Sequence, residues 1–199
     1  MSTSNQPTRQ RLSAPERREL VLAAATHAFA QSGFAGTTTD AVAKEAGVSQ
    51  PYVVRIFGTK LDLFLEVFDR ASGKIRDAFA AVIAESFDPD SDEDWERLSR
   101  AYLDPIRDYD LLLVLMHGFM AGGQPEIGTV ARHWMARIFA LLVDAGATPD
   151  RTREFIAHGM LLNVLTAMQA PTHLTDNPEL ATLSECVYAP EDLAALRTR

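Results

Sequence analysis

The chain has 199 residues, of which 47% are apolar, so it can bury a substantial core in one or two domains. Its formal net charge of −8 argues at first against a nucleic-acid partner. The single cysteine, Cys186, excludes an internal disulfide and any zinc site built on several thiolates. The first eleven residues lack the apolar core of a secretory signal, and no apolar run approaches the roughly 18 residues of a membrane span. We therefore expect a cytoplasmic protein without a cofactor or a membrane segment.

The charge is unevenly distributed along the chain. Residues 1–76 carry ten Lys or Arg and seven Asp or Glu, a net charge of +3, whereas residues 77–199 carry nine and twenty, a net charge of −11. Phosphate binding depends on the local potential more than on the global sum. The amino-terminal part therefore stays a candidate for DNA binding. Its first residues, 1–11, are expected to form a disordered basic arm that offers Arg9 and Arg11.

The first predicted helix begins at a capping box formed by Ser13 and Glu16. It ends at Gly33, with Phe34 placed to fold back onto the last turn. Apolar residues at helical spacing form its buried stripe: Val21, Ala24, Ala25, Ala28 and Phe29. We expect this helix to brace the segment that follows.

Residues 33–60, GFAGTTTDAVAKEAGVSQPYVVRIFGTK, have the pattern of two short helices joined by a tight turn. Thr38 can cap the first helix through a backbone amide of its first turn, and Gly47 can end it in the left-handed conformation. Ser49 can cap the second helix, and Pro51 lies in its first turn, where a missing amide proton costs little. The pattern indicates a helix-turn-helix. Three apolar residues are expected to anchor the second helix from behind: Val53, Ile56 and Phe57.

These residues resemble the TetR family of transcriptional regulators over residues 16–68. The matching positions are Phe29, Gly33-Phe34, Thr37-Thr38, Val42-Ala43, Ala46-Gly47-Val48-Ser49, Phe57 and Lys60. The resemblance implies an all-α protein with a three-helix DNA-binding head over residues 12–58 and an effector-binding, dimerising body over residues 59–199. It implies a ligand-responsive regulator, in this family mostly a repressor. The chain departs from the family pattern at Asp40, Val54 and Ile56, which affects the DNA sequence that is read.

The second short helix carries the residues best suited to base edges. Gln50 suits adenine and Arg55 suits guanine in the major groove. Tyr52 can contact a thymine methyl or a phosphate, while Pro51 and Val54 can make apolar contacts. The other candidates for contacts with DNA lie at helix starts or are suited to phosphates, and Arg17 and Arg18 can assist them. They are Thr38, Thr39, Ser49, Thr59 and Lys60. The alternative for Arg55 is a surface salt bridge.

Helical signals continue through the remainder, without a convincing strand. The predicted helices span residues 59–87, 95–107, 111–121, 126–145, 148–170, 178–187 and 190–196. The acidic segment 88–94 is expected to be a solvated loop, because the spacing and the glycine of a calcium-binding EF-hand are absent.

The predicted helix over residues 152–170 is apolar nearly all round, so most of its surface has to be covered. A four-helix bundle across a two-fold axis would cover it, as the family resemblance also implies; the alternative is a central helix of a monomer. The candidate interface residues are Phe155, Ile156, Gly159, Leu162, Asn163 and Thr166. Two heads in a homodimer can enter successive major grooves about 34–36 Å apart and bind a palindromic operator.

The resemblance implies a small-molecule effector pocket between the middle helices. The candidates are Phe79, Tyr102, Met116, His117, Phe119, Met120, Trp134, Met135, Phe139 and Phe155. Methionines adapt to variable ligands, and Tyr102, His117 and Trp134 place polar groups among apolar neighbours. The alternative is an ordinary core. We hypothesise that a bound, largely apolar effector tilts the fourth helix and releases the DNA.

Two other classes of protein compete with a regulator. The histidines show no metal-ligand spacing, and neither a GxSxG motif nor a phosphate-binding glycine loop is present, so we expect no metal site and no enzyme. A helical interaction module without DNA binding is the other alternative. Gln50, Arg55 and Lys60 argue against it.

Overall fold

The computed structural model describes residues 13–196, and this part of the chain contains helices and no strand, which confirms the all-α fold class. Three helices form the head: α1 (Ala14–Gly36), α2 (Thr39–Glu45) and α3 (Gln50–Phe57). The body consists of α4 (Lys60–Glu85), α5 (Asp92–Ile106), α6 (Tyr109–Met120), α7 (Pro125–Asp144), α8 (Pro149–Ala167), α9 (Pro178–Val187) and α10 (Pro190–Leu196), with 3-10 turns η1 (Ala121–Gly123) and η2 (Ala170–Thr172). The expected basic arm, residues 1–11, lies outside the described residues.

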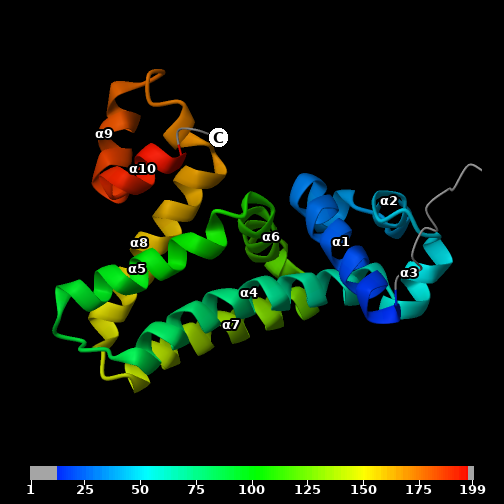
Figure 1. Cartoon of the computed structure of the whole chain (residues 1–199), viewed down its shortest axis with the longest axis horizontal. Helices are drawn as coiled ribbons and strands as arrows, with labels where there is room; N and C mark the ends of the chain where they lie inside the picture. The colour runs from blue at the N-terminus through cyan, green and yellow to red at the C-terminus, as the bar shows by residue number, and fades with distance from the viewer. Residues whose placement is uncertain (1–12, 197–199) are drawn as a thin grey trace, which may run out of the picture.

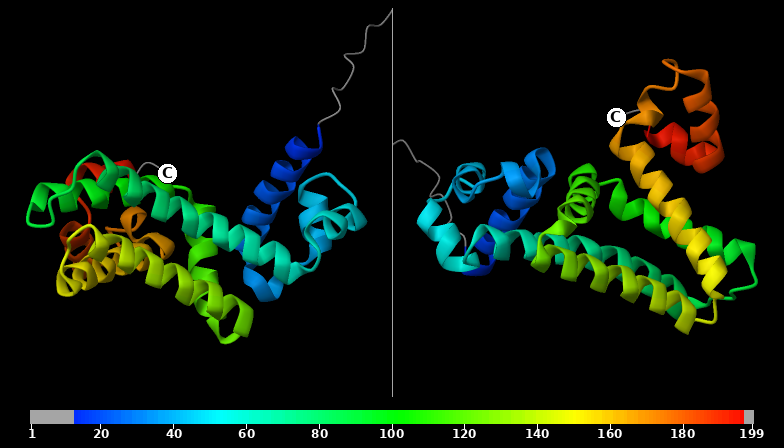
Figure 2. Two further views of the ribbon diagram at one scale, coloured as in Figure 1. Left: turned by 90° about the horizontal axis from the view of Figure 1, so that it is seen from below. Right: turned by 180° about the vertical axis from the view of Figure 1, so that it is seen from behind.

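The long helix α4 joins the two parts of the molecule. Figure 1 shows the head at one end of α4, α7 lying along it, and α5, α6 and α8 on its other side. The small lobe of α9 and α10 lies beyond α8, away from the head (Figure 2). Within residues 13–196 no helix has the length and apolar character that crossing a membrane requires.

The first helix ends in a break that its sequence predicts. The Ser13–Glu16 capping box is present at its start, and Gly33 leaves the helical conformation with φ of 64°. The Thr37 hydroxyl closes the break by hydrogen-bonding to the carbonyl oxygens of Ala28, at 3.0 Å, and Gly33, at 2.8 Å. A residue with a β-carbon is strained at positive φ, so this position favours glycine.

The acidic segment after α4 is only partly a loop. We expected a loop over residues 88–94, but α5 begins at Asp92, and the Ser91 hydroxyl accepts a hydrogen bond from the Asp94 amide. Carboxylates are favourable in the first turn of a helix, where the backbone amides and the macrodipole are positive. The acidic run therefore starts α5.

Aromatic rings connect the cores of head and body along α4. Phe64 packs edge-on against Phe29 of α1, with ring centres 5.0 Å apart, and Phe34 lies 5.2 Å from it. One turn further, Phe68 lies 6.1 Å from Phe64 and packs edge-on against Phe119 of α6 at 6.0 Å. Phe29, Phe64 and Phe68 are fully buried. Both parts of the molecule thus share one continuous core.

Helix α6 also contacts the head directly. His27 of α1 pairs with Asp110 of α6, with Nδ1 and Oδ2 2.8 Å apart. Near the other end of α6, His117 Nε2 lies 3.1 Å from the carbonyl oxygen of Ala30. The His117 ring also lies against the break at Gly33, where a β-carbon added to the glycine would be 3.0 Å from His117 Nδ1. The break at Gly33 therefore leaves space for His117.

We expect Gly118→Ala to destabilise the protein. A β-carbon on Gly118 would lie 2.3 Å from the fully buried Phe68 ring, which has no room to move. Overpacking of this kind costs about 2 kcal/mol, more than the roughly 1 kcal/mol that helix propensity returns for alanine over glycine. Thermal and denaturant unfolding would measure the loss. Gly123→Ala, with no atom within 4 Å of the added carbon, is the matched control. Equal stabilities of the two variants would contradict the packing described.

The contact between His27 and Asp110 should depend on pH. The hydrogen bond to Asp110, and then its charge, raise the pKa of His27 above its ordinary value. A raised folded-state pKa adds stability below the unfolded value of about 6.5 and loses it as the pH rises through the folded value. At about pH 5.5 the melting temperature of wild type should therefore be higher than that of His27→Gln, and this difference should disappear by about pH 8.5. In an Asp110→Asn background the effect of His27→Gln on the melting temperature should no longer depend on pH. A difference between wild type and His27→Gln that persists at high pH would contradict the proposed role of this pair.

Candidate DNA-binding face and ligand cavity

Helix α3 is held on the head by one narrow stripe. Val53 and Phe57 are buried, as expected, whereas Ile56 is 37% exposed. The prediction that Ile56 anchors α3 is wrong, because it lies beside the stripe, where neither α1 nor α2 covers it. Ser49 occupies the expected N-cap position, but its side chain makes no capping hydrogen bond. The Ser49 hydroxyl is therefore left for other partners.

Of the residues predicted to contact bases, Arg55 lies on the outward side of α3, whereas Gln50 lies at the start of the helix beside α2. The Gln50 side-chain amide donates to the Thr39 hydroxyl at 3.2 Å. The Tyr52 ring lies near two guanidinium groups, with Arg55 5.2 Å and Arg17 5.7 Å from its centre. Within the described residues Arg55 forms no ion pair, so the salt-bridge alternative finds no partner there. Pro51 and Val54 are exposed on the same helix.

The start of α4 borders this surface. The Thr59 amide and hydroxyl both donate to Asp62 Oδ2, at 2.9 and 2.7 Å, so its two donors are used inside a capping box. These bonds also lower the pKa of Asp62. Thr38 caps α2 by accepting from Ala41, at 3.1 Å, which leaves its hydroxyl proton free to donate. Lys60 Nζ lies 3.4 Å from a carbonyl oxygen of the head, that of Ala35.

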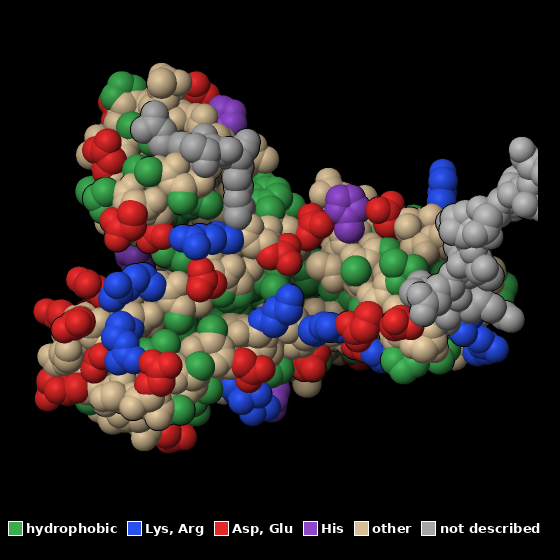
Figure 3. Space-filling view, viewed as in Figure 1, with side chains coloured by type: hydrophobic (Ala, Val, Ile, Leu, Met, Phe, Trp, Pro, Cys, Tyr) green, Lys and Arg blue, Asp and Glu red, His purple; other side chains and the backbone are tan. Residues whose placement is uncertain are grey.

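None of the ten residues predicted to contact DNA is buried, and they lie on α2, α3 and the start of α4. Arg18, named as an assistant, pairs with Glu66 at 2.6 Å and lies over the Phe57 ring, so it braces α1 against α3 and α4. Figure 3 shows carboxylates gathered at the opposite end of the molecule, around the α4–α5 connection. This acidic end of the body is thus remote from the candidate DNA-binding face, although other carboxylates lie on the head itself.

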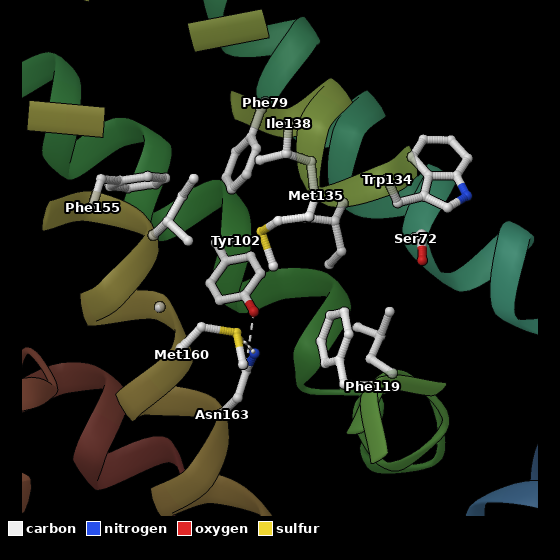
Figure 4. A pocket seen from close by; sticks show the side chains of 14 residues that line it. Ser72, Phe79, Tyr102, Phe119, Trp134, Met135, Ile138, Phe155, Met160 and Asn163 are labelled. Carbon is white, nitrogen blue, oxygen red and sulfur yellow. Dashed lines mark hydrogen bonds between the residues drawn. The ribbon is translucent and has the colours of Figure 1, made fainter. Parts of the chain in front are cut away.

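A cavity of about 60 Å³ lies in the body between α4, α5, α6, α7 and α8 (Figure 4). Its lining consists of Ser72, Ile75, Phe79, Tyr102, Leu115, Phe119, Trp134, Met135, Ile138, Phe155, Ile156, Gly159, Met160 and Asn163. Three ring contacts stabilise its far wall: Phe79 with Tyr102 at 5.8 Å, Phe79 with Phe155 at 5.4 Å, and Phe155 with Trp95 at 5.3 Å. Such a concave, mostly apolar site suits a small ligand.

The structure brings together six of the ten pocket candidates and separates the others. Phe79, Tyr102, Phe119, Trp134, Met135 and Phe155 line the cavity. Met116 packs into the core elsewhere, and His117 turns to the head. Met120 is 77% exposed and Phe139 is 37% exposed, because they lie on the outer sides of α6 and α7. Placing Met116, His117, Met120 and Phe139 in the pocket is therefore not supported by these positions.

The polar groups of the cavity differ from the expected ones. The Trp134 indole donates to Asp69 Oδ1 at 2.8 Å, so that its polar edge is already satisfied. The Tyr102 hydroxyl donates to Asn163 Oδ1 at 2.7 Å, and burial raises the pKa of Tyr102 to about 12. Two buried polar residues of the cavity were not expected there: Asn163, which was predicted to lie in the dimer interface, and Ser72, for which no role was predicted. Helical spacing is the only sequence feature that could have indicated the missed cavity residues: Ser72 and Ile75, for example, share a face of α4 with Phe79.

The expected dimer residues lie mostly inside the protomer. Leu162, Asn163 and Thr166 are buried, and the Thr166 hydroxyl lies 2.7 Å from the Tyr188 hydroxyl of α9. Phe155 and Gly159 face the cavity, and Ile156 lies between the cavity and an open groove on α7 and α8. The face that these helices leave uncovered carries four large apolar side chains that are at least 37% exposed, Phe139, Leu161, Val164 and Met168, beside a groove that Arg132 and Arg153 also line. Burial of the inner face by α5 and α9 explains why the predicted set points inward.

Residues 21–67 match the family described as bacterial regulatory proteins, tetR family. The match begins within α1, includes α2 and α3, and ends within α4. Over 60 residues the chain is 40% identical to the HTH-type transcriptional activator FasR of Mycolicibacterium smegmatis, covering 30% of this chain and 27% of FasR. The matches with curated relatives thus span little more than a quarter of those proteins' length.

Solved structures extend the similarity beyond the head. A TetR-like transcriptional regulator from Rhodococcus sp. RHA1 is 25% identical, with 79% of this chain and 87% of that chain covered and a TM-score of 0.62. The multidrug binding protein EbrR, solved with imidazole, is 27% identical, with 88% and 97% covered and a TM-score of 0.57. TetR-type regulators are not enzymes, which answers the enzyme alternative. Residues 21–67 thus match the amino-terminal domain of the TetR family of transcriptional regulators, and the described chain shares the helical fold of TetR-like regulators.

Proposed function

We propose that this protein is a homodimeric, ligand-responsive repressor that binds a palindromic operator through α3 and is released by a small, largely apolar effector. The supporting observation is that Arg55 lies on the side of α3 that faces away from the buried Val53 and Phe57, while Gln50 at the start of the helix is not buried. Neither side chain forms an ion pair within the described residues. A head over residues 12–58 and a body over residues 59–199 belong to the same proposal.

Base reading is assigned to Gln50 in the first turn of α3 and Arg55 in its last turn. Among residues 13–196 the Gln50 side chain bonds only to the Thr39 hydroxyl, a neutral contact that an adenine edge can replace. Arg55 rests over Tyr52, from which it can swing to a guanine without breaking a salt bridge. Lys60 and Thr38 are assigned to phosphates, since each keeps a donor that can reach outward.

The homodimer is proposed to form through the outer faces of α7 and α8. Phe139, Leu161, Val164 and Met168 form an uncovered apolar surface, continuous with the open groove that Ile156 and Ala157 line. Exposed apolar patches of this kind mark association surfaces. Two-fold pairing of the α8 helices would bury the patch on itself and fix the separation of the two heads.

Release of DNA is proposed to run through α4 and α6. Phe119 of α6 lines the cavity, and the neighbouring His117 contacts Ala30 in the head. Helix α4 carries Phe79 at the cavity and Lys60 at the DNA-binding end. An effector that binds better to a shifted arrangement of these helices would favour that arrangement and so change the spacing of the heads. The ratio of its affinities for the two arrangements limits how far the equilibrium can shift. The relative EbrR is named a multidrug binding protein, which agrees with a ligand cavity in this fold.

Repression is proposed because it is the prevailing mode in the family, while the relative FasR is named an activator. A reporter gene under the chain's own operator, selected from a random duplex pool, would measure the direction. Higher expression without the regulator supports repression. Lower expression would overturn it in favour of activation.

Two substitutions should separate affinity from specificity. Lys60→Ala should weaken binding to every duplex and reduce the salt dependence by about one phosphate contact. Gln50→Ala should cost about 1–3 kcal/mol at one base pair and little elsewhere. Fluorescence anisotropy on the selected operator and on single-base variants would measure both. Lys74→Ala, an exposed lysine further along α4, is the control that should leave binding unchanged. If wild type prefers no duplex, the DNA-binding proposal fails and the interaction-module alternative gains.

Val164→Glu should convert the dimer into a monomer. The substitution places two carboxylates in an apolar interface, where unpaired charges are strongly unfavourable. Sedimentation equilibrium would detect the loss of mass, and operator affinity should fall with it because one head contacts a single half-site. Leu183→Glu on α9 changes a leucine with 41% exposure outside the proposed interface and should stay dimeric. A dimeric Val164→Glu protein would mean that the interface lies elsewhere.

A further inference from the structure

The cavity carries no charged side chain. None of its 14 lining residues is Asp, Glu, Lys, Arg or His, and most are aromatic, aliphatic or thioether side chains (Figure 4). Transfer of an unpaired charge into such surroundings is far more costly than transfer of a neutral polar group. Carboxylates and ammonium ions are thus excluded as well-bound occupants, and an uncharged ligand is favoured.

Two buried side chains that line the cavity carry a hydrogen-bond donor without a strong acceptor among the described residues: the Ser72 hydroxyl of α4 and, with two protons to donate, the Asn163 amide of α8. Asn163 is 1% exposed, and its Oδ1 accepts from Tyr102 at 2.7 Å. This bond turns the amide nitrogen toward Met160, whose sulfur lies 3.9 Å away. A thioether is a weak acceptor, whereas an amide nitrogen has two protons to donate. The Tyr102 phenol donates to the oxygen of Asn163, so this oxygen is occupied while the nitrogen stays available.

The size of the cavity defines how a ligand can enter. Its volume of about 60 Å³ is well below the roughly 300 Å³ of a site for a drug-sized molecule. Met135 and Met160 lie on either side of the Tyr102 ring in Figure 4. Unbranched methionine side chains change rotamer readily. A ligand that displaces Met160 would gain volume and expose the Asn163 amide in the same movement.

We propose that the effector is an uncharged, largely apolar molecule with a hydrogen-bond acceptor, such as a carbonyl oxygen, and that the acceptor binds to the Asn163 side-chain nitrogen. Asn163 is then the specificity-determining residue of the site, and Tyr102 is a positioning residue that holds the amide in this orientation. The role of the molecule as effector rests on the proposed function; the recognition chemistry of the cavity does not.

Acetophenone and α-methylstyrene are suitable probes, since they have nearly the same shape and differ by a carbonyl oxygen in place of a methylene group. Benzoate supplies the charged comparison. Methionine methyl groups labelled with ¹³C report the location, because Met135 and Met160 line the cavity while Met120 and Met168 are 77% and 55% exposed. NMR titration of the full-length protein gives the affinity of each probe. Shifts at Met135 and Met160 alone mark binding in the cavity.

Wild type should bind acetophenone roughly fivefold more tightly than α-methylstyrene, the effect of one net hydrogen bond. Benzoate should bind weakest. Asn163→Leu should remove the preference for the ketone while keeping the affinity for the alkene. Tyr102→Phe should reduce the preference by freeing the amide to turn, again without loss of the alkene. A simply structural role for either residue would lower both affinities together.

Equal binding of ketone and alkene to wild type, or binding of neither, would overturn the proposed recognition without use of any variant. An unchanged preference in Asn163→Leu would overturn the role of Asn163, and in Tyr102→Phe that of Tyr102. Anisotropy on the operator with acetophenone present is a separate measurement. Ketone-selective binding that leaves DNA affinity unchanged supports the chemistry of the cavity and contradicts its function as the release switch.

Discussion

A ladder of aromatic rings along α4 is the feature on which the rest of the structure depends. Phe64 packs against Phe29 in the head, and Phe68, one turn later, packs against Phe119 at the cavity. Because these rings are buried and in contact, the head cannot shift on the body without repacking them. Gly118 tightens the same junction, since its lack of a β-carbon lets α6 approach Phe68. Head and body therefore move as parts of one packed core.

This shared core connects the walls of the cavity mechanically to the DNA-binding end. Phe119 belongs to the ladder and to the cavity wall at once, while His117 of the same helix reaches the break in α1. Close-packed interiors tend to switch between discrete arrangements rather than deform gradually. A ligand that moves α6 would therefore act on α1 and α4 together. The acidic end of the body lies far from the head, so the local charge near α3 is not cancelled by it (Figure 3).

Local features of the chain were predictable because their causes lie within a few residues. The capping box at Ser13, the left-handed Gly47 and the tail helices over 178–187 and 190–196 all occur as expected. The family resemblance of the head is confirmed by the match over residues 21–67. Even the acidic run that was expected to be a loop follows a local rule, that of carboxylates in the first turn of a helix.

The sequence by itself determined which residues form helices, which of them share a helix face, and that the head is a helix-turn-helix. Only the tertiary structure decided which neighbour covers each face. It exposed Ile56 and Met120, turned His117 toward the head, and placed Asn163 in the cavity rather than on the outer face. The physical reason is that helical periodicity relates positions within one helix, whereas burial depends on helices that are distant in the chain.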